Sequence, residues 1–344
     1  MSEFRRDPFT QRWRLFAEGR SARPNEYFGG APGSTGAEDC PFCEGRESRT
    51  PPEVAVVRPG GSPPNGPGWS VRSVPNRFPT VASPAEGRPF PSSGMFARAP
   101  GSGVHEVIIT SPTHTPGFAL LPEGQLRTVF RFFRERVRAI SARPGIRAAL
   151  LFENKGPESG GTLPHPHAQL IASETVPHRL LEESAAFERD TGTGATCTLE
   201  AVVRAEIEAT ERVIVHEELF DAFAPFASEH PDEVWVVPRR HVATFGDASD
   251  DEVDRLAFLL PAVLRALDAL RPDASYNWFL HGLRAPAAGS RGFHWHVEIA
   301  PRLVRADGFE LGAGTSVNAV LPELAASEYR AAWPAASAPG PRKR

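Results

Sequence analysis

The sequence has 344 residues, of which 40% are hydrophobic, and a formal net charge of −4. A chain of this length and apolar content can bury a full core and divides into roughly two domains of about 150 residues. The small negative charge gives no general attraction to nucleic acid, and no run of about eighteen apolar residues predicts a membrane span. The N-terminal segment also lacks the apolar core of a signal peptide, so we expect a cytoplasmic globular protein that binds neither nucleic acid nor membrane.

The first 65 residues or so form an arm that is rich in Pro and Gly through "RPGGSPPNGPGW". The arm contains Cys40 and Cys43 in "CPFC", and an odd, small number of cysteines is more typical of a metal site than of a disulfide framework. The alternative, a glutaredoxin-like redox pair, would need a strand before the motif and a helix that starts at Cys40, and the flanking segments favour neither. Cys197 has no partner in a motif, so we expect it in the core or at the surface.

The rest of the chain contains an internal repeat. The segment "HEVIITSPTHT" (105–115) matches "DEVWVVPRRHV" (232–242), which pairs Glu106 with Glu233 and His114 with His241 at one offset. The same offset carries one apolar stripe of helical spacing onto another: Phe132, Phe133, Val137 and Ile140 fall on Leu259, Leu260, Leu264 and Leu267. Each copy therefore contains a helix that faces a core.

The strand-like segments that follow these helices also correspond. "ALLFENKG" (149–156) matches "SYNWFLHG" (275–282), and "PHPHAQL" matches "FHWHVEI" with a shift of two residues. The pattern predicts a duplicated strand–helix–strand–strand unit over about 70–175 and about 215–302, joined by a helical connector. We expect an α+β fold with an N-terminal half over 1–185, a C-terminal half over 186–325 and a disordered Pro/Ala/Arg tail over 326–344.

Each copy contains a His-x-His motif. Alternate residues of a strand point to one face, so His165 and His167 should address one site, and His294 and His296 another. A solvated sheet edge would explain one isolated pair equally well. The glycines of "ESGGTLP" favour a ligand site, because consecutive glycines allow close backbone approach and their N–H groups can bind an anion.

Taken together, these motifs resemble the galactose-1-phosphate uridylyltransferase family, the nucleotidyltransferase branch of the histidine-triad superfamily. The elements of the resemblance are "RDPFTQRW", "RSARP", "CPFC", "VPNRFP", "SPTH", "FENKG", "GGTLPHPHAQ" and "FHWHVEIAP", in this order over residues 1 to about 325. The family resemblance implies two antiparallel half-barrel sheets with flanking helices. It also implies a homodimer that acts on a nucleotide sugar and a sugar phosphate.

The resemblance assigns roles to individual residues. His167 would attack the α-phosphorus and carry the nucleotidyl group as a phosphoramidate, with its other ring nitrogen bonded to the backbone carbonyl of His165. Gln169 stands where histidine-triad hydrolases have a third histidine, so it would bind the phosphoryl group without acting as a general acid. The implied substrate-binding residues are Arg20, Arg23, Asn76, Asn154, Gly160, Thr162 and Gln169.

Two metal sites are implied in the same way. Cys40, Cys43, His114 and His165 would form a closed tetrahedral zinc site. Glu183, His281, His294 and His296 would form a second site for zinc or iron. The alternative for the second site is that its His-x-His is a relic of the duplication with packed or solvated imidazoles.

One segment departs from the family pattern. Residues 308–318, "GFELGAGTSVN", lack the Lys, Tyr and Glu with which well-known members bind the sugar phosphate in the partner's site, and Arg77 replaces a common acidic residue. We expect a UDP-glucose–hexose-1-phosphate uridylyltransferase of galactose metabolism. The segment also resembles a subgroup that includes ADP-glucose phosphorylase, so adenylyl transfer to phosphate is the alternative. A nucleotide-binding module without catalysis is a further alternative.

Overall fold

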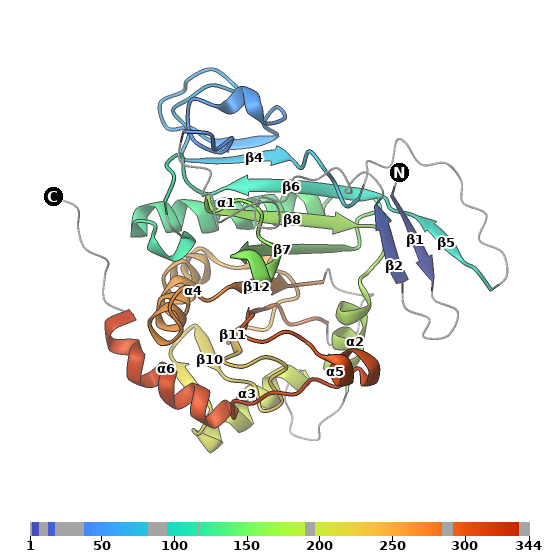
Figure 1. Ribbon diagram of the computed structural model, residues 1–344, viewed down its shortest axis with the longest axis vertical. Helices are drawn as coiled ribbons and strands as arrows, with labels where there is room; N and C mark the ends of the chain where they lie inside the picture. The colour runs from blue at the N-terminus through green and yellow to red at the C-terminus, as the bar shows by residue number, and fades with distance from the viewer. Residues whose placement is uncertain are drawn as a thin grey trace.

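The computed structural model describes residues 2–6, 13–17, 38–81, 95–115, 117–189, 197–283 and 292–336. Within these residues, ten strands form one antiparallel sheet in the order β3-β4-β6-β8-β7-β12-β13-β11-β10-β9. The strands are β3 (Ala55–Val57), β4 (Val71–Pro75), β6 (Gly103–Ile109), β7 (Ala148–Lys155), β8 (His167–Ser173), β9 (Val213–His216), β10 (Phe220–Phe223), β11 (Val234–Pro238), β12 (Tyr276–His281) and β13 (His296–Pro301). A smaller sheet pairs β1 (Ser2–Arg6) with β2 (Trp13–Ala17) and β5 (Arg98–Pro100) (Figure 1).

The internal repeat is visible in the order of the elements. The first copy runs β4, β6, α1, β7, β8 and the second runs β10, β11, α4, β12, β13. This confirms the duplicated α+β fold. The sheets of the two halves are continuous, because β7 pairs antiparallel with β12 and brings Leu151 opposite Leu280 and Asn154 opposite Asn277. Elements of both halves thus meet at the centre of one sheet.

Two long helices pack against each other and against one face of the sheet (Figure 1). They are α1 (Glu123–Ser141) and α4 (Asp250–Leu270). All eight apolar residues of the repeated stripes are buried in the core, as their helical spacing predicts. Ser249 and Glu252 form a reciprocal capping box that starts α4, which satisfies backbone N–H groups that would otherwise lack partners.

Four further helices occur in the C-terminal part of the described chain. The predicted connector contains α2 (His178–Phe187) and α3 (Thr198–Ala209), and α5 (Gly308–Ala313) follows the last strand. The expectation of a disordered tail from residue 326 is wrong up to Ala336, where α6 (Pro322–Ala336) ends. Ala326 and Tyr329 lie one turn apart and are buried in the main core against α4, so this alanine-rich segment has an apolar face that stabilises it as a helix. Residues 337–344 lie outside the described residues.

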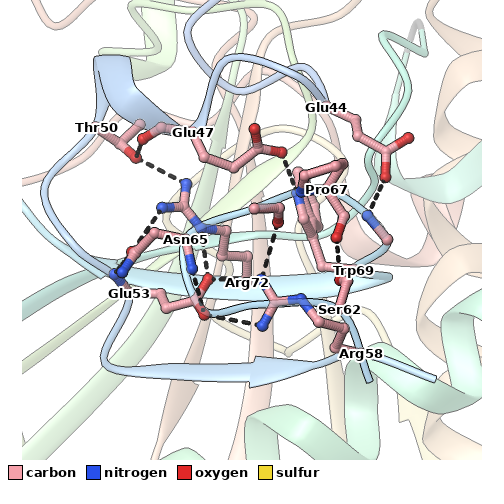
Figure 2. Close-up of polar contacts among 12 residues, drawn as sticks. Glu44, Glu47, Thr50, Glu53, Arg58, Ser62, Asn65, Pro67, Trp69 and Arg72 are labelled. Carbon is pink, nitrogen blue, oxygen red and sulfur yellow. Dashed lines mark hydrogen bonds and ion pairs between the residues drawn. The ribbon is translucent and has the colours of Figure 1, made fainter. Parts of the chain in front are cut away.

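Buried ion pairs hold the arm against β4 (Figure 2). The Arg72 side chain is 1% exposed, and it donates to the Glu53 carboxylate over 3.0 Å and to the Thr50 hydroxyl over 2.7 Å. Arg58 donates two hydrogen bonds, of 2.9 and 3.0 Å, to the same carboxylate. The Arg58 hydrogen bonds lower the pKa of Glu53 to about 2, so the carboxylate stays ionised beside both cations. The arm is thereby fixed next to the strand that leads to Asn76.

None of the helices in the described part of the chain is both long enough and apolar enough to cross a membrane.

Candidate functional site

The His-Pro-His motif lies at the start of β8. The strand begins at His167, and His165 lies just before it. The two rings lie near each other, since both contact the ring of Phe42. They nevertheless belong to two adjacent groups, which corrects the expectation that the pair addresses one site: the His165 ring faces Cys40 and Cys43, whereas His167 lines a cavity.

His167 is held in one tautomer by its own motif. Its Nδ1 lies 2.8 Å from the backbone carbonyl oxygen of His165, the contact that the resemblance implies. A carbonyl can only accept, so Nδ1 carries the hydrogen and donates it, and the lone pair is on Nε2. The ring is 92% buried and lies 5.2 Å from the ring of Phe42, measured between centroids. A neutral imidazole fixed in this way is suited to act as a nucleophile.

The cavity beside His167 has a volume of about 730 Å³, within the range of small-molecule sites. Of the residues expected at the substrate, Asn76, Thr162, His167 and Gln169 line it. Arg77 lines it too, at the position that is often acidic in the family. Arg20 and Arg23 lie outside the described residues.

The glycine loop follows β7 and forms a tight turn. Gly156 and Gly160 have φ values of +82° and +79°, which favour glycine, and a Cβ on Gly161 would lie 2.7 Å from the Gly156 carbonyl oxygen. Gly160 lines a second cavity of about 410 Å³ with Asn277 and Arg302. The glycines therefore allow a tight backbone turn, and the approach to a ligand that the sequence predicts stays a prediction.

Two carboxamides of the expected site have buried partners that the sequence did not indicate. Asn277 Nδ2 donates to Asn154 Oδ1 over 2.7 Å, and Arg302 donates to Asn277 Oδ1 over 2.6 Å. His105 Nε2 lies 3.0 Å from Gln169 Oε1. Each partner comes from a neighbouring strand or its end, so only the sheet register reveals it.

The first group of possible metal ligands consists of Cys40, Cys43, His114 and His165, as the motifs predict. The distances from sulfur to Nδ1 are 3.5 Å for Cys40–His165, 3.7 Å for Cys43–His165 and 3.7 Å for Cys43–His114. Tetrahedral zinc, with Zn–S of about 2.3 Å and Zn–N of about 2.05 Å, places sulfur and nitrogen about 3.6 Å apart. The residues therefore fit a closed zinc site.

The surroundings of the first group support the same conclusion. His165 Nε2 donates to the Ser111 carbonyl over 2.8 Å, as metal-bound histidines commonly do with their second nitrogen. Burial lowers the pKa of His165 to about 4, which keeps the imidazole neutral and able to bind a metal ion. The CPFC segment forms a turn followed by a short 3₁₀ helix at Glu47–Arg49, so it lacks the helix starting at Cys40 that a redox pair would need.

The second group contains Glu183, His281, His296 and Glu298. His281 Nδ1 lies 2.9 Å from a Glu183 oxygen and 3.3 Å from a Glu298 oxygen, and His296 Nε2 lies 3.3 Å from Glu298. Arg179 donates to both carboxylates, over 2.6 Å to Glu298 and 3.1 Å to Glu183. Two imidazoles and two carboxylates fit zinc or iron by donor type.

His294 is not part of the second group, which corrects the predicted ligand set. Its Nε2 donates to the Pro238 carbonyl over 2.8 Å, and its Nδ1 lies 3.6 Å from the sulfur of Cys197. Glu298 takes its place, because it lies two residues after His296 on β13 and so faces the same side of the strand. The alternation of "HVE" could have identified Glu298 from the sequence.

Cys197, His241 and His294 form a third group that could hold a metal ion. Burial lowers the pKa of His294 to about 4. His241 and His294 are the repeats of His114 and His165, so the duplication itself could have indicated this group. Cys197 is buried in the core, one of the two placements expected for it, and its sulfur also lies beside His294. The sequence did not indicate this neighbour, because Cys197 comes from the connector and not from either copy.

Known proteins are similar to this chain in sequence and in fold. Residues 69–177 match the family model "Galactose-1-phosphate uridyl transferase, N-terminal domain". The chain is 29% identical over 336 residues to an ADP-glucose phosphorylase of Arabidopsis thaliana, which covers 95% of this chain and 92% of that protein. It is 28% identical over 339 residues to a galactose-1-phosphate uridylyltransferase of Thermotoga maritima, which covers 96% and 98%.

Solved structures agree with these relatives. An ADP-glucose phosphorylase from Arabidopsis thaliana with bound ADP-glucose superposes with a TM-score of 0.72 at 28% identity, over 96% of this chain and 99% of that one. A uridylyltransferase structure gives 0.76 at 29% identity, over 97% and 99%. By class the chain is thus a nucleotidyltransferase. Residues 69–177 match the N-terminal domain of the galactose-1-phosphate uridylyltransferase family, and nearly the whole chain is similar to the relatives named above.

Proposed function

We propose that the chain transfers a nucleoside monophosphate from a nucleotide sugar to a phosphate-bearing acceptor, through a covalent nucleotidyl-His167. The donor is UDP-glucose and the acceptor is a hexose 1-phosphate such as galactose 1-phosphate. The observation that carries this proposal is the position of His167, whose ring lines the 730 Å³ cavity while its Nδ1 donates to the His165 carbonyl. A site that only binds nucleotide has no need of an imidazole fixed in this tautomer.

The transfer takes two displacements. In the first, the lone pair of His167 Nε2 attacks the α-phosphorus, the bond to the bridging oxygen breaks, and the sugar 1-phosphate leaves. In the second, a phosphate oxygen of the acceptor attacks the same phosphorus, the P–N bond breaks, and its electrons return to Nε2. The amide of Gln169 and the hydroxyl of Thr162, which line the cavity with His167, stabilise the charge on the phosphoryl oxygens. Asn154 and Gly160 are not among the residues that line this cavity.

Zinc bound by Cys40, Cys43, His114 and His165 would have a structural role, because four protein donors leave no open position. These residues would tie the arm to the segment that presents His167. The second group, around His281, would bind zinc or iron at the other end of the duplicated motif. We further propose that the active form is a homodimer in which residues 308–318 of one protomer approach the site of its partner.

A second candidate is ADP-glucose phosphorylase, in which an adenylyl group passes to inorganic phosphate. Residues 308–318 favour it, since Glu310 caps α5 through its hydrogen bond to the Asp307 N–H instead of extending toward a sugar. Arg77 in the cavity wall, where an acidic residue is common beside the ribose, is a departure from the family pattern that does not select between the two bases. The likeness to the plant ADP-glucose phosphorylase supports the same alternative.

The test is covalent labelling in the absence of an acceptor. The metal-replete protein is incubated with UDP-glucose or with ADP-glucose, and the intact mass is measured after denaturation at neutral pH. We expect a uridylyl adduct that survives base and is lost in acid, as phosphoramidates are. Galactose 1-phosphate or inorganic phosphate is then added to the labelled protein, and the one that removes the label identifies the acceptor.

His178→Ala is the matched control for the loss of an imidazole at His167. His178 lies half-exposed at the start of α2, and among the ion pairs of the described residues it pairs only with Glu182. This variant should label like the parent. An adenylyl adduct discharged by phosphate would establish the second candidate. If neither donor gave an adduct, the transferase proposal would be wrong, and a nucleotide-binding module would become the better interpretation.

A further inference from the structure

A buried histidine lies directly behind the cavity. His105 is on β6, which pairs with β8, and its ring is 95% buried. Its Nδ1 lies 3.0 Å from the backbone nitrogen of Thr80, and its Nε2 lies 3.0 Å from Gln169 Oε1. The two nitrogens thus face different partners, one of which belongs to the proposed site.

The backbone partner determines the tautomer of His105. A backbone N–H can only donate, so the Thr80 N–H makes Nδ1 of His105 the acceptor. In a neutral imidazole the hydrogen must then be on Nε2, which faces Gln169. The Nε2–H therefore donates, and the atom of Gln169 that receives it has to be the carboxamide oxygen.

Asn76 is oriented in the same manner by a second backbone N–H. The Phe78 N–H donates to Asn76 Oδ1 over 2.8 Å, which turns Nδ2 of Asn76 toward Gln169 Oε1 at 3.5 Å. Nδ2 also lies 3.0 Å from His105 Nε2. This contact would be a hydrogen bond only if Nε2 accepted, and because Nδ1 already accepts from Thr80, both nitrogens are donors whose common acceptor is Gln169 Oε1. Two donors fixed by backbone groups thus converge on one oxygen.

This arrangement leaves a single orientation for the Gln169 carboxamide. An amide rotated by half a turn would set its NH₂ against two other donors in a buried place, which would leave donors unsatisfied. With the oxygen held at His105, the NH₂ group points away from His105. Gln169 lines the same cavity as His167 and lies two residues after it on β8, on the same face of the strand.

We propose that His105 is a positioning residue that keeps the NH₂ group of Gln169 directed at the phosphoryl oxygens of the donor substrate. The proposal rests on the function proposed above. A correctly oriented Gln169 presents a hydrogen-bond donor to an oxygen that gains charge in the transition state, whereas a rotated amide would present a lone pair and repel that oxygen. His105 acts through Gln169 and does not itself touch the substrate.

Two substitutions at His105 distinguish the role of Nδ1 from the role of Nε2. In His105→Asn, the shorter amide can accept from the Thr80 N–H in place of Nδ1, but it cannot reach Gln169. In His105→Gln, the longer amide can place an NH₂ group near the Nε2 position and donate to Gln169. We expect adduct formation in a single turnover to slow by at least about tenfold in His105→Asn and to stay within about threefold of the parent in His105→Gln.

A double-mutant cycle with Gln169→Ala tests whether His105 acts through Gln169. If it does, His105→Asn should slow Gln169→Ala no further, because the group that it positions is already gone. Binding of the nucleotide sugar, measured by calorimetry, should change far less than the rate of adduct formation. Equal rates in His105→Asn and the parent, or additive losses in the double variant, would overturn the proposal.

The tautomer can be read independently of activity. Long-range ¹H–¹⁵N correlation spectra of the histidine rings distinguish a hydrogen on Nε2 from one on Nδ1, and His105→Gln assigns the signal. A hydrogen on Nδ1 would overturn the inference even if the protein labels normally. A parent protein that forms no adduct with either donor, yet shows Nε2–H at His105, would instead reject the proposed function and leave the orientation of Gln169 standing.

Discussion

The two His-x-His motifs share a backbone framework but place their second histidine in different surroundings. In both copies the first histidine donates through Nε2 to a carbonyl over 2.8 Å. In both copies Nδ1 of the second donates to the carbonyl of the first, over 2.8 Å for His167 and 3.0 Å for His296. His167 nevertheless lines a large cavity, whereas His296 is fully enclosed.

The surroundings of the two rings differ. Residues of the arm such as Pro41 and Phe42 line the cavity beside His167, whereas Phe187, Trp235 and Phe293 pack around His296. The residue two places after each second histidine differs too: it is Gln169 in the first copy and Glu298 in the second, and the Glu298 carboxylate attracts His281, His296 and Arg179. The same local backbone thus carries a cavity-lining imidazole in one copy and an imidazole of a possible metal-ligand group in the other.

The largest expected effect is at the nucleophile. We expect His167→Ala to lower nucleotidyl transfer by on the order of 10⁴-fold or more, because no other described residue of the cavity is an imidazole fixed for attack. Zinc content and fold should be retained, since this ring is not among the possible metal ligands. Peptide mapping of the labelled parent should find the nucleotide on His167 and none on His296. A variant with a tenth of the parent rate would contradict the covalent mechanism.

The next largest effect is the loss of metal and stability when a cysteine is replaced in the first or the third group of possible metal ligands. Cys43→Ser should remove one tightly bound zinc and lower the free energy of unfolding by on the order of 5 kcal/mol, because the four-donor group connects the arm to the catalytic segment. Cys197→Ser should cost less, since its group has three donors among the described residues. Metal analysis by mass spectrometry and thermal unfolding measure both variants. Unchanged zinc in Cys43→Ser would exclude CPFC from the site.

A third substitution makes the first copy resemble the second. Gln169→Glu places a carboxylate beside His167 and in the path of the substrate phosphates. We expect adduct formation to slow by about a hundredfold, because a donor to the phosphoryl oxygen becomes a like charge. Stopped single-turnover labelling gives the rate, and Gln169→Ala is the matched control that removes the donor without adding charge. If both variants were equally slow, charge would not be the deciding factor.

The smallest effect concerns the arm, whose ion-pair network is specific to the first copy. The pKa of Glu53 is about 2 in the folded protein, below the ordinary value of 4.5. A depressed pKa stabilises the fold above the unfolded value and loses that contribution as the pH falls through the folded value. Between about pH 5 and about pH 3, we expect Glu53 to account for a loss of about 2 kcal/mol.

Urea unfolding of the parent and of Glu53→Gln at both pH values measures this contribution. The variant should be less stable at the higher pH, because two buried guanidinium groups lose their counter-charge. Its stability should fall less between the two pH values than that of the parent. A parallel decline in both proteins would show that the acid sensitivity has another origin.

Motifs within one segment were predictable, whereas contacts between distant segments were less so. The duplication and the helices followed from spacing and repetition, and the group of Cys40, Cys43, His114 and His165 followed from the family resemblance of the motifs. His105 and Asn277 were missed, because a partner across neighbouring strands depends on sheet register. The assignment of His294 failed for a local reason, since β13 begins only at His296.

The tail shows a limit of composition as a guide. Alanine, arginine and proline suggested disorder after residue 326, yet Ala326 and Tyr329 lie on one face of a helix and are buried against α4. A short apolar stripe is enough when a large core already offers a surface for it to cover. Periodicity was therefore more informative than overall content in this segment.

The pairing of β7 with β12 determines whether either half of the chain could be stable alone. Neither copy is a closed body, because each would expose a full-length edge strand if it were separated from the other. Asn277 of β12 also donates to Asn154, so the first copy produced alone would lose that hydrogen bond as well as the strand that covers β7. A chain cut between α2 and α3 would yield two fragments, one with β7 and the other with β12 as an exposed edge strand. Association of the two fragments would then compete with aggregation of each fragment with copies of itself.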